Sequence, residues 1–207
     1  MPDRVGVDAE VAARVTDLTA RAAAAAVAVA RRHGVRVADP VLLSDGVNAV
    51  VHLAPAPLVA RVATWTPLLR PGTAEPFTRE VELATALTGL GAAVVPVSDL
   101  LPPGPHAHDG LLLSFWQHVE VLPHRPSPAE AGRALAELHD ALDDVRLGWT
   151  GDPLDRVFGD LAEFDRVGEQ LGADPDQVGR TGELAGRLRQ IVVPRPRSEA
   201  RLSLIHI

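Results

Sequence analysis

Two residues of opposite charge stand where short apolar segments can hold them in place. Arg61 lies within the apolar run 58–62, and Glu80 lies in a helix-forming segment further along the chain. A guanidinium is planar and permanently charged, and it binds carboxylates or phosphates through paired hydrogen bonds. All 20 residues of the Lys and Arg types are arginine. Arginine must therefore fill any role that needs a strong cation. The alternative is a solvated arginine at a strand end.

A carboxylate on the following helix can hold this arginine, and Glu80 and Glu82 are the candidates. Two residues along a helix differ by about 200° in direction, so only one of them can face the sheet. The apolar positions that predict the buried side are Val81, Leu87 and either Ala84 or Leu83. This pattern favours Glu80, with Glu82 as its competitor. Both could instead be ordinary surface carboxylates.

The periodicity and turn chemistry predict an α+β chain in two lobes. The expected helices cover residues 9–33, 76–88, 128–142, 153–171 and 175–191. The expected strands cover residues 41–43, 50–53, 58–62, 94–97 and 111–116. The start of the third helix is marked by a capping box, Ser127-Pro128-Ala129-Glu130. The short turns between the first strands predict an antiparallel meander.

Composition excludes several classes of protein. The 207 residues include no Cys, so disulfides, thiolate metal sites and cysteine nucleophiles are ruled out. The net charge of −7 argues against a nucleic-acid binder. No apolar run is long enough to cross a membrane. We therefore expect a cytoplasmic protein without nucleic-acid or membrane partners.

The histidines give only weak indications of a metal site or a catalytic base. His106 and His108 flank one alanine in a Pro/Gly-rich loop, but no convincing third ligand is nearby, and we interpret them as solvated. His139 lies on a predicted helix, where a packed or capping role is more common than a base. We predict no metal site in this chain.

Five stretches, in this order, resemble the N-terminal lobe of the protein-kinase-like fold, and in particular the aminoglycoside phosphotransferase family of small-molecule kinases. They are residues 44–53, 58–62, 77–84, 110–120 and 131–142. In the same order, they resemble the phosphate-covering turn, the strand that carries the cation, the helix with its paired Glu, the hinge strand and the first long helix of the second lobe. The resemblance covers about residues 35 to 142.

The resemblance implies a kinase that transfers the γ-phosphoryl group of ATP, with Mg²⁺, to a hydroxyl of a small substrate. It implies these ATP-binding residues: Gly46 and Asn48 in the turn, Arg61, its partner Glu80, and the backbone of Phe115, Trp116, Gln117 and His118. The turn residues could equally have a purely structural role. The two aromatic side chains could simply belong to the core.

We also expect a pocket between the meander and residues 115–120. The expected lining residues are Leu43, Val51, Ala60 and either Phe115 or Trp116. Alternation along a strand turns Ala60 away from the face that carries Arg61, so Ala60 is the weakest member of this set.

The catalytic motif of the family, His-Gly-Asp with a following Asn, does not occur in this sequence. The nearest string is Phe158-Gly159-Asp160. We therefore assign no catalytic residue, place the metal ligands outside the chain, and expect the chain itself to be inactive. The alternatives are a non-catalytic nucleotide-binding or interaction module with a degenerate kinase lobe, and an all-helical regulator.

The expected organisation has four parts: an N-terminal helix at 1–34, a kinase-like N-lobe at 35–121, the start of a helical C-lobe at 122–201, and a tail at 202–207. The tail Leu-Ser-Leu-Ile-His-Ile reads back as a transposon end used in sequencing libraries. We interpret it as an adapter with no structural role, and we expect the gene to be cut near Arg201.

Overall fold

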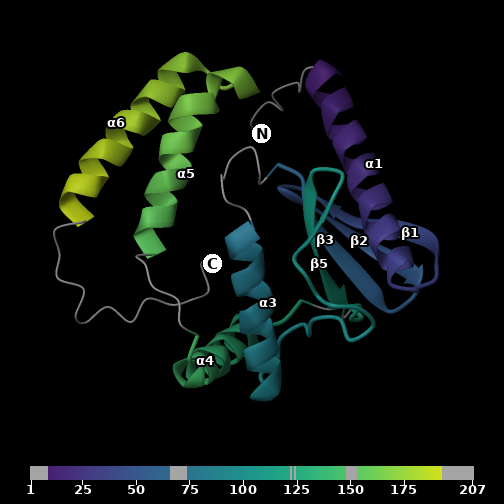
Figure 1. The fold of residues 1–207 in the computed structure, drawn as a ribbon. Coiled ribbons are helices and arrows are strands. Elements are labelled where there is room, and N and C mark those ends of the chain that lie inside the picture. Colours follow the sequence, from purple (N-terminus) through teal and green to yellow (C-terminus); the bar gives the residue numbers. More distant parts are fainter. Residues whose placement is uncertain (1–8, 66–73, 122, 124, 148–152, 193–207) are drawn as a thin grey trace.

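An antiparallel sheet of five strands organises the first half of the chain (Figure 1). The computed structural model describes residues 9–65, 74–121, 123, 125–147 and 153–192. The strands are β1 (Val37–Asp45), β2 (Asn48–Pro55), β3 (Leu58–Ala63), β4 (His106–His108) and β5 (Leu111–Gln117). Their order across the sheet is β1-β2-β3-β5-β4. The predicted α+β class is confirmed, and β1, β2 and β3 form the expected meander.

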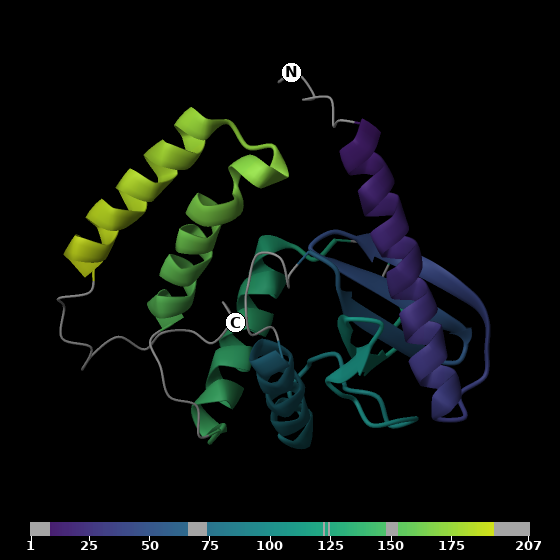
Figure 2. The same cartoon turned by 45° about the horizontal axis from the view of Figure 1, so that its top comes forward.

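The helix α1 (Ala9–Arg32) lies across one face of this sheet (Figures 1 and 2). Val51, Ala60 and Phe115 are fully buried in the core cluster that α1 and the sheet form together. The buried side of α1 is rich in alanine, whose small side chain lets a helix approach a sheet closely. The part of α1 from Leu18 to Ala30 therefore packs into the same core as the strands that follow it.

The helix α3 (Ala74–Gly89) packs against the opposite face of the sheet. Arg61 of β3 pairs with Glu80 of α3, whereas its neighbours Ala60 and Val62 are buried in the core shared with α1. Successive side chains of a strand point to opposite faces, so the two helices cover opposite sides. Four apolar side chains form the buried side of α3: Phe77, Val81, Ala84 and Leu87.

Two details of the sheet differ from the sequence prediction. The segment 106–108, which we expected to be part of a loop, pairs with β5 as the short edge strand β4. The expected strand 94–97 contributes a single bridge, from Val97 to Trp116. Proline at position 96 supplies no N–H for a ladder, which is why this segment does not continue as a strand.

Three helices and one short 3₁₀ turn follow the sheet. They are α4 (Pro128–Asp144), α5 (Pro153–Val167), η1 (Glu169–Leu171) and α6 (Pro175–Val192). The predicted capping box of α4 is confirmed. The backbone N–H of Ser127 donates to Oε2 of Glu130, and the backbone N–H of Glu130 donates to Oγ of Ser127. The helices α5 and α6 lie side by side in both views, away from the sheet (Figures 1 and 2).

The C-terminal helices leave much of their apolar surface open. No residue of α4 is buried. On α5 and α6, Val157, Leu184, Leu188 and Ile191 are between 42% and 59% exposed. Within the part of the chain that is described, no helix has the length and apolarity needed to cross a bilayer. The tail 202–207 lies outside the described residues.

We expect Gly168→Ala to lower the free energy of unfolding of the α5–α6 pair by about 1–3 kcal/mol. A Cβ at position 168 would lie 2.7 Å from the carbonyl oxygen of Phe164 and 2.9 Å from Cγ2 of Val178. The matched control is Gly179→Ala on α6, whose Cβ would have no described atom within 4 Å. This control should be neutral or stabilise the helix by up to about 1 kcal/mol. Urea denaturation followed by circular dichroism measures both, and equal midpoints would contradict the packing.

Candidate functional site

The predicted contact between Arg61 and Glu80 is confirmed. Nη1 of Arg61 on β3 donates a hydrogen bond to Oε2 of Glu80 on α3. Both side chains are partly exposed, at 29% and 37%, so solvent screens the pair and its own contribution to stability is modest. The pair links strand and helix while one side of each group still reaches solvent.

The competitor Glu82 lies on the other side of α3. It is exposed, whereas Val81, Ala84 and Leu87 are buried against the sheet. The choice of Glu80 is therefore correct. Of the two candidates for the middle of this apolar stripe, Ala84 is buried and Leu83 is only half-buried.

The surroundings of Arg61 add an aromatic ring and a second cation. The guanidinium carbon lies 4.9 Å from the ring centroid of Phe77, a cation–π geometry. Burial, and then the positive charge of Arg156 on α5, lower the pKa of Arg61 from its ordinary value. An arginine still stays charged at neutral pH. Glu80 and Phe77 thus both contact the guanidinium of Arg61.

The β1–β2 turn lies at the end of the sheet where β3 finishes, since Asn48 pairs with Ala63. The N–H of Gly46 donates to the carbonyl of Asn48 at 3.3 Å. Gly46 has an ordinary negative φ, and a Cβ there would have no described atom within 4 Å. The fold therefore does not require glycine at position 46. Asn48 is half-buried at the start of β2.

The side chains of the predicted hinge residues divide between the two faces of the sheet. The side chain of Phe115 is fully buried in the core under α1. Trp116 points to the other face, where its indole N–H donates to Oγ of Ser114 at 3.0 Å. Gln117 is half-buried at the end of β5. The ring of His118 stacks on that of His52, with centroids 3.9 Å apart.

Backbone donors of this segment are already used. The N–H groups of Phe115, Gln117 and His118 donate to the carbonyls of Pro103, Pro96 and Pro57 at 2.8, 3.0 and 3.0 Å. These three groups cannot also donate to a bound heterocycle. The exposed residues 119–121 follow directly, and they are the next backbone groups that could reach a ligand.

The pocket expected from the sequence is not formed by the residues named for it. Val51, Ala60 and Phe115 face α1 and are fully buried, while Leu43 is 51% exposed. The opposite face carries Val59, which pairs with Trp116, and Arg61, which pairs with Ser114. Neither Val59 nor Ser114 was predicted as a site residue. Counting in twos from Arg61 along β3 would have found Val59, whereas Ser114 is placed beside Arg61 only by the register of β3 and β5.

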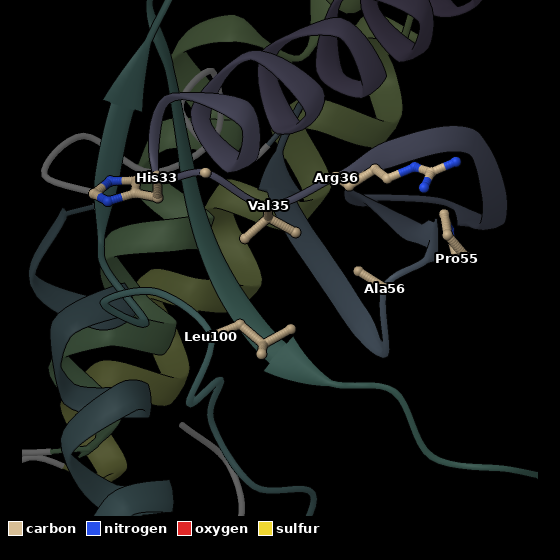
Figure 3. Close-up of a pocket in the computed structure, with 7 residues that line it drawn as sticks. His33, Val35, Arg36, Pro55, Ala56 and Leu100 are labelled. Atoms are coloured by element: carbon tan, nitrogen blue, oxygen red, sulfur yellow. The ribbon is translucent and has the colours of Figure 1, made fainter.

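A different hollow lies where α1 ends, beside the β2–β3 turn (Figure 3). Its volume is about 360 Å³ and it is wide open to solvent. In Figure 3 the side chains of His33 and Arg36 extend in opposite directions, so they do not converge on one ligand group. The lining residues are His33, Gly34, Val35, Arg36, Pro55, Ala56 and Leu100.

The loop histidines take part in local contacts. Nε2 of His106 lies 2.6 Å from the carbonyl oxygen of Pro102, and Nη2 of Arg32 lies 3.1 Å from Nδ1 of His108. His139 is exposed on α4. Among the described residues, no group of three or more His, Asp or Glu side chains is arranged to hold a metal ion.

Comparison of the chain with protein-family models, with curated proteins and with solved structures finds no match.

Proposed function

We propose that this chain is the nucleotide-binding part of a small-molecule kinase that resembles the aminoglycoside phosphotransferases. One observation carries the proposal: a cation on the third strand is held by a carboxylate on the helix across the sheet, at Arg61 and Glu80. A sequence resemblance suggested this pair, and the contact joins residues 19 positions apart. The five-strand order with a helix between β3 and β4 is compatible with the same fold.

Arg61 is the residue that would bind the nucleotide phosphates. A guanidinium has five N–H donors, and the contact with Glu80 uses Nη1. Glu80 limits the rotamers of the arginine, so less side-chain entropy is lost when an anion binds.

The adenine ring would lie on the sheet face that carries Val59 and Trp116. Because the N–H groups of Phe115, Gln117 and His118 are used within the protein, we assign the adenine-facing backbone to residues 119–121. This moves the hinge by a few residues from the sequence-based position. The turn that contains Gly46 and Asn48 would cover the phosphates.

In the family reaction, a substrate hydroxyl attacks the γ-phosphorus, the bond to the β-phosphate oxygen breaks, and ADP leaves. The described residues offer no ligand set for the Mg²⁺ that accompanies ATP. We therefore derive no catalytic step for them. What they supply in this proposal is binding and orientation of the nucleotide.

Calorimetric titration of the purified chain tests the proposal. We expect saturable binding of ATP and ADP and weaker binding of adenosine, because Arg61 recognises phosphate. Trp116 on β5 and Trp65, two residues after the end of β3, give an independent fluorescence signal. The absence of ATP binding at millimolar concentration, with a folded circular dichroism spectrum, would overturn the proposal.

A further inference from the structure

We propose that Thr64 is a positioning residue, which holds the β1–β2 turn in the geometry that the nucleotide phosphates require. This inference rests on the proposed function. Thr64 has no part in the sequence resemblance. It would not touch the phosphates itself and would act only by holding the turn that covers them.

The contacts of Thr64 converge on the two residues at the tip of the turn. Its Oγ1 lies 3.0 Å from the carbonyl oxygen of Val47 and 3.4 Å from that of Gly46. The next residue, Trp65, donates its backbone N–H to the same Val47 carbonyl at 3.1 Å. A hydroxyl has one proton to donate, so the shorter contact is the main hydrogen bond, and the two lone pairs of the Val47 oxygen accept both donors.

Among the described residues, the side chains of this turn bury little surface. Val47 is 51% exposed, and Gly46 presents no side chain. Thr64 itself is only 3% exposed, so its hydroxyl is shielded from competing water. A hydrogen bond in such a place contributes more than one at the surface. The Thr64 hydroxyl is therefore, with the N–H groups of Trp65 and Gly46, one of the contacts that set the conformation of the turn.

The same contact fixes the distance between the turn and Arg61. Thr64 follows Arg61 by three residues along β3 and its end, and β3 is a central strand of the sheet. On its other side the turn is tied to α1, where Oγ1 of Thr19 donates to Oδ2 of Asp45 at 2.9 Å. A turn held from two sides has little conformational entropy left to lose when a phosphate binds.

The test compares three substitutions in the full chain. Thr64→Val keeps the shape and removes the hydroxyl, whereas Thr64→Ser keeps the hydroxyl. The control Thr88→Val removes a hydroxyl that bonds within α3, to the carbonyl of Ala84. Calorimetry measures the dissociation constants of ATP and of adenosine. We expect Thr64→Val to weaken ATP binding about tenfold and to leave adenosine binding unchanged, and both Thr64→Ser and Thr88→Val to behave like the wild type.

A second measurement reads the turn without any nucleotide. Amide hydrogen exchange at residues 45–48 should become about tenfold faster in Thr64→Val and stay at the wild-type rate in Thr64→Ser. If Thr64→Val does not fold, Thr64→Cys replaces the hydroxyl by the weak S–H donor at similar volume, and the same direction of change is expected.

The outcomes separate the two proposals. ATP binding to the wild type with equal affinity in Thr64→Val overturns the role of Thr64 alone. Equal weakening of ATP and adenosine shows a general structural effect and also overturns it. If the wild type binds no nucleotide, the proposed function fails, and the role of Thr64 in phosphate binding falls with it.

Discussion

Replacing Arg61 with methionine is expected to weaken ATP binding by about 10- to 100-fold, the size of a charge-assisted hydrogen bond lost to phosphate. Methionine keeps much of the aliphatic length that packs near Phe77, so the fold should persist. Glu80→Gln should have a smaller effect in the same direction, because it removes the charge that orients Arg61 while the arginine remains. Calorimetric titration with ATP and adenosine measures both variants.

The matched control is Arg180→Met on α6, where the arginine is exposed and distant in sequence from the proposed site. This variant removes the same charge from the chain and should bind ATP as the wild type does. If it weakened ATP binding as much as Arg61→Met does, the loss would reflect the net charge of the protein. The assignment of Arg61 to the phosphates would then be wrong.

Phe115→Ala is expected to reduce the free energy of unfolding by about 3–5 kcal/mol. The ring is fully buried between α1 and the sheet, and its centroid lies 5.4 Å from that of His106. Alanine would leave a cavity in the middle of this core. Urea denaturation followed by circular dichroism measures the loss.

The fraction of Phe115→Ala that stays folded should bind ATP with the wild-type dissociation constant, because the side chain faces away from the sheet surface that carries Arg61. Leu184→Ala, at a position 54% exposed on α6, is the control and should change stability by no more than about 0.5 kcal/mol. Phe115→Leu is a milder variant that should stay folded. If it lost ATP affinity without losing stability, Phe115 would belong to the ligand site, and its assignment to the core would be wrong.

Local patterns predicted most of the elements. Alanine-rich periodicity indicated α1, the capping box at Ser127 indicated the start of α4, and the turn at Gly46 indicated the β1–β2 hairpin. These signals come from interactions between residues a few positions apart, so they are readable without the fold. The strand β4 was missed because three residues among prolines and glycines form a strand only when β5 is beside them.

A sequence resemblance suggested that Arg61 and Glu80 would face each other, and local patterns favoured Glu80 over Glu82. Strand alternation fixes the side of β3 on which Arg61 lies, and the apolar stripe of α3 fixes the side that Glu80 shares.

Only the tertiary structure decided which face of the sheet becomes the closed core. Both faces of β2 and β3 carry valines, such as Val51 and Val59, and the docking of α1 on one of them selected that face. It also decided which backbone groups near Phe115 stay available, because their partners come from the distant segment 96–103 and from the β2–β3 turn. Long-range packing and pairing of this kind leave no periodic trace in the sequence.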